Sequence, residues 1–194
     1  MKRFFASFCA LFLLLFLLPS LALTSGQAPL LQGQDAGEET YYLVEDAETG
    51  EVMKLSPLTY IKGVVAAEMP LSYHTEALKA QAVAAHSYAL YRISQKLSGG
   101  DGQGEAYLST DPAECQGYLD EEGRREQWGS QFDAYEAKLT EAVSAVIDKV
   151  LVYDGEPVMA MFHAVSGGKT EDAANLFGSP VSYLVPADSA SDEL

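Results

Sequence analysis

Apolar residues along this chain recur with two periods, one typical of strands and one typical of helices. Short apolar runs bounded by turn-forming residues predict four β-strands. The predicted strands are 41–44, 51–55, 150–153 and 157–165. The dipeptide Asp154-Gly155 separates the last two runs, and Asp-Gly is a strong signal for a tight hairpin turn. We therefore expect two β-hairpins, one near each end of the folded part of the chain.

Spacings of three and four residues between apolar positions predict three helices. The predicted helices are 57–68, 75–97 and 135–146. Ser56 is a good N-cap and Pro57 suits the first helical position, whereas Pro70 disfavours helical geometry in the residue before it. Residues 105–131 have only a weak period and predict no element. Helices and hairpins in a chain of 194 residues favour a single α+β domain.

The first 22 residues have the pattern of an export signal. The basic pair Lys2-Arg3 precedes an almost unbroken apolar run, and small residues follow at positions 20 and 22. The run barely reaches the about 20 residues that span a membrane, so a cleaved signal peptide and an uncleaved anchor both stay open. Residues 23–40 have no period and predict a flexible linker, which leaves 41–194 as the domain. We expect this domain to work outside the cytoplasm, secreted or held at the outer face of the membrane.

The chain is strongly acidic, with 12 Lys and Arg against 28 Asp and Glu and a formal net charge of −16. Such a charge repels nucleic acid and anionic lipid surfaces, so we expect neither as a partner. Cys9 lies in the leader, which leaves Cys115 without a partner for an intrachain disulfide. With only three histidines and no paired-cysteine motif, the sequence predicts no zinc or other metal site.

A carboxylate stands where the pattern of the first helix favours an apolar residue. Glu68 shares its helix face with Ile61 and Val65. Burial on that face and the negative end of the helix dipole both disfavour the charged carboxylate, which suits a proton donor near neutral pH. Glu68 is therefore a candidate catalytic acid. The alternative is a solvated side chain at a frayed helix end.

Two polar residues interrupt the stripes of the second helix. His86 lies among apolar residues of one face, where a buried or half-buried histidine is the favoured interpretation. Gln81 shares another stripe with Tyr88 and Tyr91, where its amide suits hydrogen bonding in a groove. Gln81 is therefore a candidate substrate contact.

Residues 165–170, Val-Ser-Gly-Gly-Lys-Thr, look like the end of a nucleotide-binding loop. A phosphate-binding loop of the pattern G-x-x-x-x-G-K-[ST] requires glycine at the position of His163, so we expect no nucleotide. The backbone N–H groups of Gly167-Gly168, with Lys169 beside them, suit a carboxylate or a polar sugar group. The simpler explanation is a tight turn that needs glycine for positive φ.

Three ordered motifs resemble those of a known family. They are YIKGVVAAEMP at 60–70, EALKAQAVAAHSYAL at 76–90 and SGGKTEDAANLFGSPVSYL at 166–184. These motifs are similar to those of the stage II sporulation protein D family and of the related amidase-enhancer proteins. The resemblance implies a peptidoglycan lytic transglycosylase that acts outside the membrane on glycan strands, without a cofactor. It also implies a role in engulfment of the forespore, with a cell-wall amidase and other engulfment proteins as partners.

The resemblance further implies that Glu68 is the catalytic acid. It would protonate the glycosidic oxygen between N-acetylmuramic acid and N-acetylglucosamine as the bond breaks through an oxocarbenium-like state. The carboxylate would then take the proton of the muramoyl C6 hydroxyl, whose oxygen closes a 1,6-anhydro ring on C1 without water. The loop Ser166-Gly167-Gly168-Lys169 would orient the sugar, with Gln81 and His86 as further contacts.

The chain departs from the family's pattern at two points. The family usually has arginine at the position of His86, and histidine is shorter and only partly charged at neutral pH, so we expect weaker or differently tuned activity. Family domains also continue well beyond residue 194, so we expect a C-terminally incomplete domain that lacks one lobe of the groove. The alternative is a non-catalytic wall-binding activator of an amidase, or an inactive paralogue.

Overall fold

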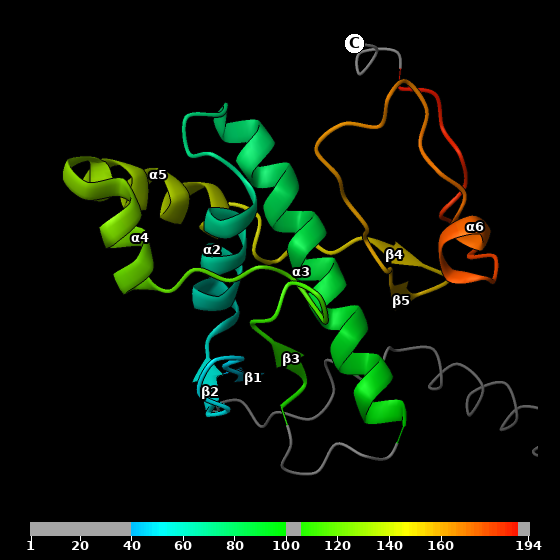
Figure 1. Ribbon diagram of the computed structural model, residues 1–194, viewed down its shortest axis with the longest axis horizontal. Coiled ribbons are helices and arrows are strands. Elements are labelled where there is room, and N and C mark those ends of the chain that lie inside the picture. Colours follow the sequence, from blue (N-terminus) through cyan, green and yellow to red (C-terminus); the bar gives the residue numbers. More distant parts are fainter. Residues whose placement is uncertain (1–39, 100–105, 190–194) are drawn as a thin grey trace, which may run out of the picture. The chain divides into compact units, whose positions relative to one another are not determined.

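The computed structural model describes residues 40–99 and 106–189 (Figure 1). The leader and nearly all of the predicted linker lie outside these ranges, so their expected roles stay predictions. Among the described residues, Thr40–Tyr153 and the part from Pro157 onward belong to one compact unit, whereas Asp154–Glu156 belong to another. No helix in the described ranges combines the length and the apolar character that a membrane crossing requires.

A three-stranded sheet begins the described part of the chain. Its strands are β1 (Tyr42–Glu45), β2 (Val52–Leu55) and β3 (Leu108–Ser109), in the order β2-β1-β3. β1 pairs antiparallel with β2, with Tyr42 opposite Leu55, and parallel with β3. The Oδ1 atom of Asp46 accepts the backbone N–H of Thr49 at 2.8 Å and closes the β1–β2 turn. The first predicted hairpin is confirmed, whereas β3 is too short to leave a period in the sequence.

The two predicted long helices are present with nearly the expected bounds. The helices are α2 (Pro57–Glu68), α3 (Thr75–Ser98), α4 (Glu121–Trp128), α5 (Phe132–Ser144) and α6 (Ala173–Phe177), with a short 3₁₀ helix η2 (Gly129–Gln131) before α5. Ser56 caps α2, because its Oγ accepts the backbone N–H of Thr59 at 3.1 Å. Met69, ahead of Pro70, has extended geometry with φ −140° and ψ 132°. Local signals therefore set both ends of α2.

The core lies where α2, α3 and α5 pack together (Figure 1). The completely buried apolar side chains of these helices are Tyr60, Ile61, Val64 and Val65 of α2, Leu78, Ala85 and Ala89 of α3, and Leu139, Ala142 and Val143 of α5. The alanines of α3 let the helix backbones approach closely. This packing fixes the direction of α2 and therefore the place where its last residue, Glu68, emerges.

The second predicted hairpin is much smaller than the sequence suggests. Its strands are β4 (Val152–Tyr153) and β5 (Glu156–Pro157), joined by Asp154 and Gly155 at positive φ values of 52° and 87°. The predicted strand is wrong beyond residue 157. The backbone N–H of Val158 still donates to the Leu151 carbonyl at 3.1 Å, but that of Met159 donates to the Tyr183 hydroxyl at 3.0 Å instead of to a neighbouring strand. The α+β class itself is confirmed.

Candidate functional site

Glu68 is the last residue of α2, and its carboxyl group is exposed to solvent. Its Oε1 atom accepts a hydrogen bond of 2.9 Å from the backbone N–H of Gly117. Within the described residues, the other oxygen, Oε2, has no hydrogen bond or ion pair. The expectation that Glu68 is buried is wrong, because α2 ends at this residue and its side chain is exposed among the described residues. The carboxyl group is nevertheless held in place from one side and open to solvent on the other.

The segment that carries Gly117 lies directly against α2. A methyl group on Gly63 would overlap the ring of Tyr118, so the glycine is needed for the close approach. The Tyr118 ring stacks on that of Tyr60, with 5.8 Å between centroids and 11° between planes, and the Leu119 N–H donates to the Gly63 carbonyl at 3.1 Å. These contacts set the position of the Gly117 N–H that faces Glu68.

A second segment supports the turn that follows Glu68. The Lys138 ammonium of α5 donates hydrogen bonds to the carbonyl oxygens of Leu71, at 2.7 Å, and of Tyr73. Both acceptors lie between α2 and α3. The end of α2 is therefore fixed by residues from two later parts of the chain, one at Gly117 and one in α5.

Gln81 and Gln116 are both buried polar residues rather than parts of an exposed groove. Gln81 is 9% exposed and Gln116 is 4% exposed. The Gln116 amide donates to the Ala85 carbonyl of α3 at 3.3 Å, which attaches the segment before Gly117 to that helix. The Nε2 atom of Gln81 makes no hydrogen bond among the described residues. The Gln81 side chain therefore lies in the protein interior and does not line an exposed groove.

His86 is buried at 7% exposure, and its Nε2 atom lies 2.8 Å from the hydroxyl oxygen of Tyr42 in β1. Burial lowers the pKa of His86, and the nearby backbone carbonyl groups of Ile147 and Lys149 oppose part of this shift. Neither carbonyl reaches hydrogen-bond geometry with Nδ1. The ring is therefore a neutral link between α3 and β1, which is the buried histidine that the sequence favoured.

The Gly-Gly-Lys loop is an ordered turn with an exposed cation. Gly167 and Gly168 have φ values of 71° and 98°, so the turn needs glycine at both positions. The Gly168 N–H donates to Ser166 Oγ at 3.3 Å, and Lys169 forms an isolated β-bridge with Asp188. The Lys169 side chain is exposed. The loop therefore presents an ammonium group to solvent.

The structure brings together some of the predicted site residues and not others. Gln81 and His86 lie on α3, which packs against the helix that ends in Glu68. No hydrogen bond or ion pair joins Glu68 to Lys169 in the part of the chain that the structure describes. Gly117 was missed, because it lies in the weakly periodic stretch 105–131. Nothing in that stretch indicates a contact with a residue so far away in the sequence.

No group of three or more His, Cys, Asp and Glu side chains in residues 40–99 and 106–189 is arranged to hold a metal ion. Cys115 is a free cysteine of intermediate exposure. The candidate site built from the described residues thus consists of the Glu68 carboxyl group and the backbone N–H of Gly117.

Comparison with known proteins gives a consistent set of relatives. The family described as "Stage II sporulation protein" matches residues 45–153. Stage II sporulation protein D of Bacillus subtilis (strain 168) is 30% identical, over 100% of this chain and 62% of that protein. The protein of the same name from Bacillus amyloliquefaciens is 34% identical, over 69% of this chain and 38% of its own length. The amidase enhancer of Bacillus subtilis (strain 168) is 30% identical, over 68% of this chain and 15% of its own length. The chain thus spans less than two thirds of the length of each of these relatives.

Proposed function

This chain belongs to the stage II sporulation protein D family, and from that membership we propose that it is a peptidoglycan lytic transglycosylase. The observation that carries the proposal is the Glu68 carboxyl group, which is exposed to solvent and held by the Gly117 N–H at 2.9 Å. A general acid must be both fixed in position and accessible to substrate. Glu68 meets both conditions.

The two carboxyl oxygens of Glu68 have different roles in the proposed reaction. Oε1 accepts the Gly117 N–H, and Oε2 carries the proton and donates it to the glycosidic oxygen between N-acetylmuramic acid and N-acetylglucosamine. The C1–O bond breaks with its electron pair on the leaving sugar oxygen. The carboxylate then accepts the proton of the muramoyl C6 hydroxyl, and that oxygen bonds to C1 to form the 1,6-anhydro ring. One carboxyl group thus acts first as acid and then as base.

The other predicted site residues take different parts in this proposal. The exposed Lys169, on its Ser166–Lys169 turn, is assigned to the glycan strand, because an ammonium group suits the oxygens of a sugar. Gln81 and His86 are buried, so we assign them an indirect role in packing α3 against its neighbours. The strands lie in the cell wall, so the proposal includes action outside the cytoplasm during sporulation, in concert with a cell-wall amidase.

The test of this proposal measures the anhydro product of the reaction. Full-length chain is incubated with peptide-free glycan strands, and the ends are analysed by mass spectrometry, alongside Glu68→Gln and the control Glu126→Gln on the exposed face of α4. We expect 1,6-anhydro-muramoyl ends with the unchanged chain and with Glu126→Gln. Glu68→Gln should lower their rate of formation at least about 10²-fold, as loss of a general acid does. Product that forms equally fast with Glu68→Gln would overturn the assignment.

A second candidate function is suggested by one relative, because a protein named amidase enhancer is 30% identical to this chain. In this case the chain would bind the wall and stimulate an amidase without cutting the glycan. The same preparations are therefore added to a purified cell-wall amidase acting on intact wall. Stimulation by Glu68→Gln equal to that by the unchanged chain, with no anhydro product from either, favours the activator over the enzyme.

A further inference from the structure

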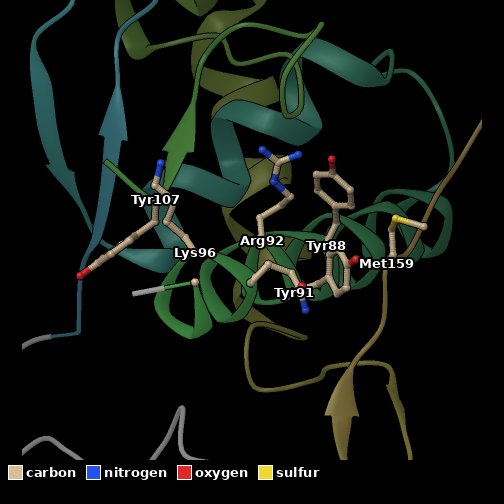
Figure 2. Close-up of a pocket in the computed structure, with 8 residues that line it drawn as sticks. Tyr88, Tyr91, Arg92, Lys96, Tyr107 and Met159 are labelled. Atoms are coloured by element: carbon tan, nitrogen blue, oxygen red, sulfur yellow. The ribbon is translucent and has the colours of Figure 1, made fainter. Parts of the chain in front are cut away.

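A cavity lies along the C-terminal half of α3 and shares no residue with the Glu68–Gly117 contact (Figure 2). Its volume is about 380 Å³, within the roughly 300–1,000 Å³ that is usual for small-ligand sites. Side chains that line it are Tyr88, Tyr91, Arg92 and Lys96 of α3, Tyr107 ahead of β3 and Met159 beyond β5. Residues from three separate parts of the chain therefore shape one hollow.

The cavity has aromatic walls. The rings of Tyr88 and Tyr91 lie 6.5 Å apart between centroids and are inclined at 39°, and both side chains, like that of Tyr107, are only partly buried. A partly exposed tyrosine offers an apolar ring face and a hydroxyl group that exchanges hydrogen bonds. Sugars have the matching surfaces, because the C–H groups of the ring form an apolar face and the hydroxyl groups surround it. The walls suit a saccharide unit.

Arg92 gives the cavity a positive charge. Figure 2 shows its side chain between those of Tyr88 and Lys96, with the guanidinium group beside the Tyr88 phenol. Arg92 is partly buried and forms no ion pair within 4 Å in the described ranges, although the Tyr88 side chain and the charge of Glu114 both favour its charged form. Its planar fork of donors matches a carboxylate group through two parallel hydrogen bonds.

The negative charge of the whole chain and the positive charge of Arg92 together favour some anionic ligands over others. A polyanion such as nucleic acid is repelled by the charge of the whole chain. A sugar unit with a single carboxylate is repelled less strongly than a polyanion and still pairs with Arg92. Peptidoglycan contains such groups in two places, the lactyl group of a peptide-free muramoyl residue and the acidic residues of the stem peptide.

We propose that this cavity is a second glycan-binding site, in which Tyr88, Tyr91 and Tyr107 contact a sugar unit and Arg92 binds its carboxylate. The identity of the ligand as peptidoglycan rests on the proposed function. The aromatic and cationic lining is independent of it. A site of this kind would bind the strand through residues other than the acid and let one carboxylate-bearing unit set the register of cleavage.

The test measures binding separately from cleavage. The full chain is studied in a Glu68→Gln background, so that strands are not cut, by titration calorimetry with three ligands: peptide-free strands, peptide-bearing strands and neutral N-acetylglucosamine oligomers. Arg92→Gln removes the positive charge, and Arg92→Lys keeps the charge but loses the planar guanidinium group. Lys149→Gln is the control, because it removes one positive charge at a residue that is 59% exposed and outside the cavity. Circular dichroism checks that each variant is folded.

We expect Arg92→Gln to weaken binding of carboxylate-bearing strands about tenfold, with a smaller loss for Arg92→Lys. Neutral oligomers should bind all of these variants equally, whereas Tyr91→Ala should weaken binding of all three ligands. A loss confined to peptide-free strands assigns the lactyl carboxylate, and one confined to peptide-bearing strands assigns the stem peptide. Equal affinities for Arg92→Gln and Lys149→Gln would overturn the proposal. Because cleavage depends on Glu68 and binding on Arg92, failure of the enzyme assignment and failure of this site give different results.

Discussion

The position of the Glu68 carboxyl group depends on a glycine that lies 49 residues later in the chain. A methyl group on Gly117 would lie 3.1 Å from Glu68 Oε1 and 3.4 Å from the Ala67 Cβ atom. The first distance is shorter than ordinary van der Waals contact, and the second is at its lower limit. The glycine thus allows the backbone N–H to reach the carboxyl group without pushing it away.

Gly117→Ala tests this dependence. We expect the turnover of glycan strands to fall about tenfold, because the added methyl group displaces the acid by a few tenths of an ångström. The midpoint of thermal unfolding should change little, since Gly117 has no positive φ and the neighbouring carboxyl group can move. Turnover and unfolding are measured on the same preparation. Unchanged turnover would contradict a positioning role for this residue.

At the scale of single residues, the role of Glu68 as the acid stays a prediction, whereas its surroundings differ from those that the sequence suggested. The helix-wheel argument selected Glu68, but it assumed burial, and the side chain is exposed because α2 ends there. His86 is buried, as its apolar neighbours indicated. Gly117 could not be found, because its contact with Glu68 depends on the path of residues 115–119 across α2. Periodicity describes neighbours on one element and contains no information about such a path.

At the scale of elements, one carboxylate joins three helices. Glu136 of α5 receives two hydrogen bonds from Arg124 of α4, at 3.0 and 3.2 Å, and forms an ion pair with Lys62 of α2. Arg124 is only 3% exposed, and its third donor, Nη1, reaches the Leu119 carbonyl at 2.8 Å. Since Leu119 follows the segment that holds Glu68, this ion cluster also supports the candidate site.

Glu136→Gln should therefore destabilise the fold. An amide at this position cannot neutralise the buried Arg124, and its NH₂ group faces the donors of Arg124 and Lys62. We expect the free energy of unfolding at pH 7 to fall by about 2–3 kcal/mol, less than for a completely buried pair because Glu136 is partly exposed. Denaturant unfolding measures the change. The control is Glu121→Gln, which breaks the exposed Glu121–Arg125 pair and should change stability by less than about 0.5 kcal/mol.

The same carboxylate makes stability depend on pH. Burial raises the pKa of Glu136, but hydrogen bonds from Arg124 and Lys62 and their charges outweigh it, so the pKa lies below its ordinary value of 4.5. The folded state thus binds this proton less readily than the unfolded state. The contribution of Glu136 is complete above pH 4.5 and is lost as pH falls through the lower pKa of the folded state. The free energy of unfolding of Glu136→Gln should lack this part of the dependence on acid pH. Identical dependence on pH for the unchanged chain and for Glu136→Gln would contradict the assignment.

The sequence predicted elements well where local signals mark their ends. Ser56 and Pro57 open α2, and Pro70 closes it, so the structure agrees to the residue. The predicted strand beyond residue 157 is wrong for the opposite reason. Met161 and Val165 have strand-forming character, but a strand forms only beside a partner, and both side chains are about half exposed. A propensity is local, whereas pairing depends on the rest of the fold.

At the scale of the whole molecule, the dominant property is charge. The net charge of −16 acts over a distance set by salt, whereas Arg92 acts on a carboxylate only at contact. The screening length falls from about 30 Å at 0.01 M salt to about 8 Å at 0.15 M. Approach of an anionic strand and its retention should therefore respond differently to salt.

We expect the association rate constant for peptide-free, carboxylate-bearing strands to rise about tenfold between 0.01 and 0.15 M salt, as screening reduces the repulsion. Stopped-flow fluorescence of the single Trp128 measures this rate. Neutral N-acetylglucosamine oligomers are the control, and their rate should not change with salt. A rate that falls with salt would mean that local cations, rather than the net charge, govern the approach of the strand.

The support of the turn after Glu68 by α5 has a consequence for the order in which the molecule becomes active. Synthesis proceeds from the N-terminus, so Glu68 is made well before Gly117, and Lys138 is made 67 residues after Leu71, whose carbonyl it holds. A partly made chain therefore contains the acid on a helix whose end has neither of its later supports. The proposed catalytic acid is therefore made early, and its position is fixed only after residues 117 and 138 have been added to the chain.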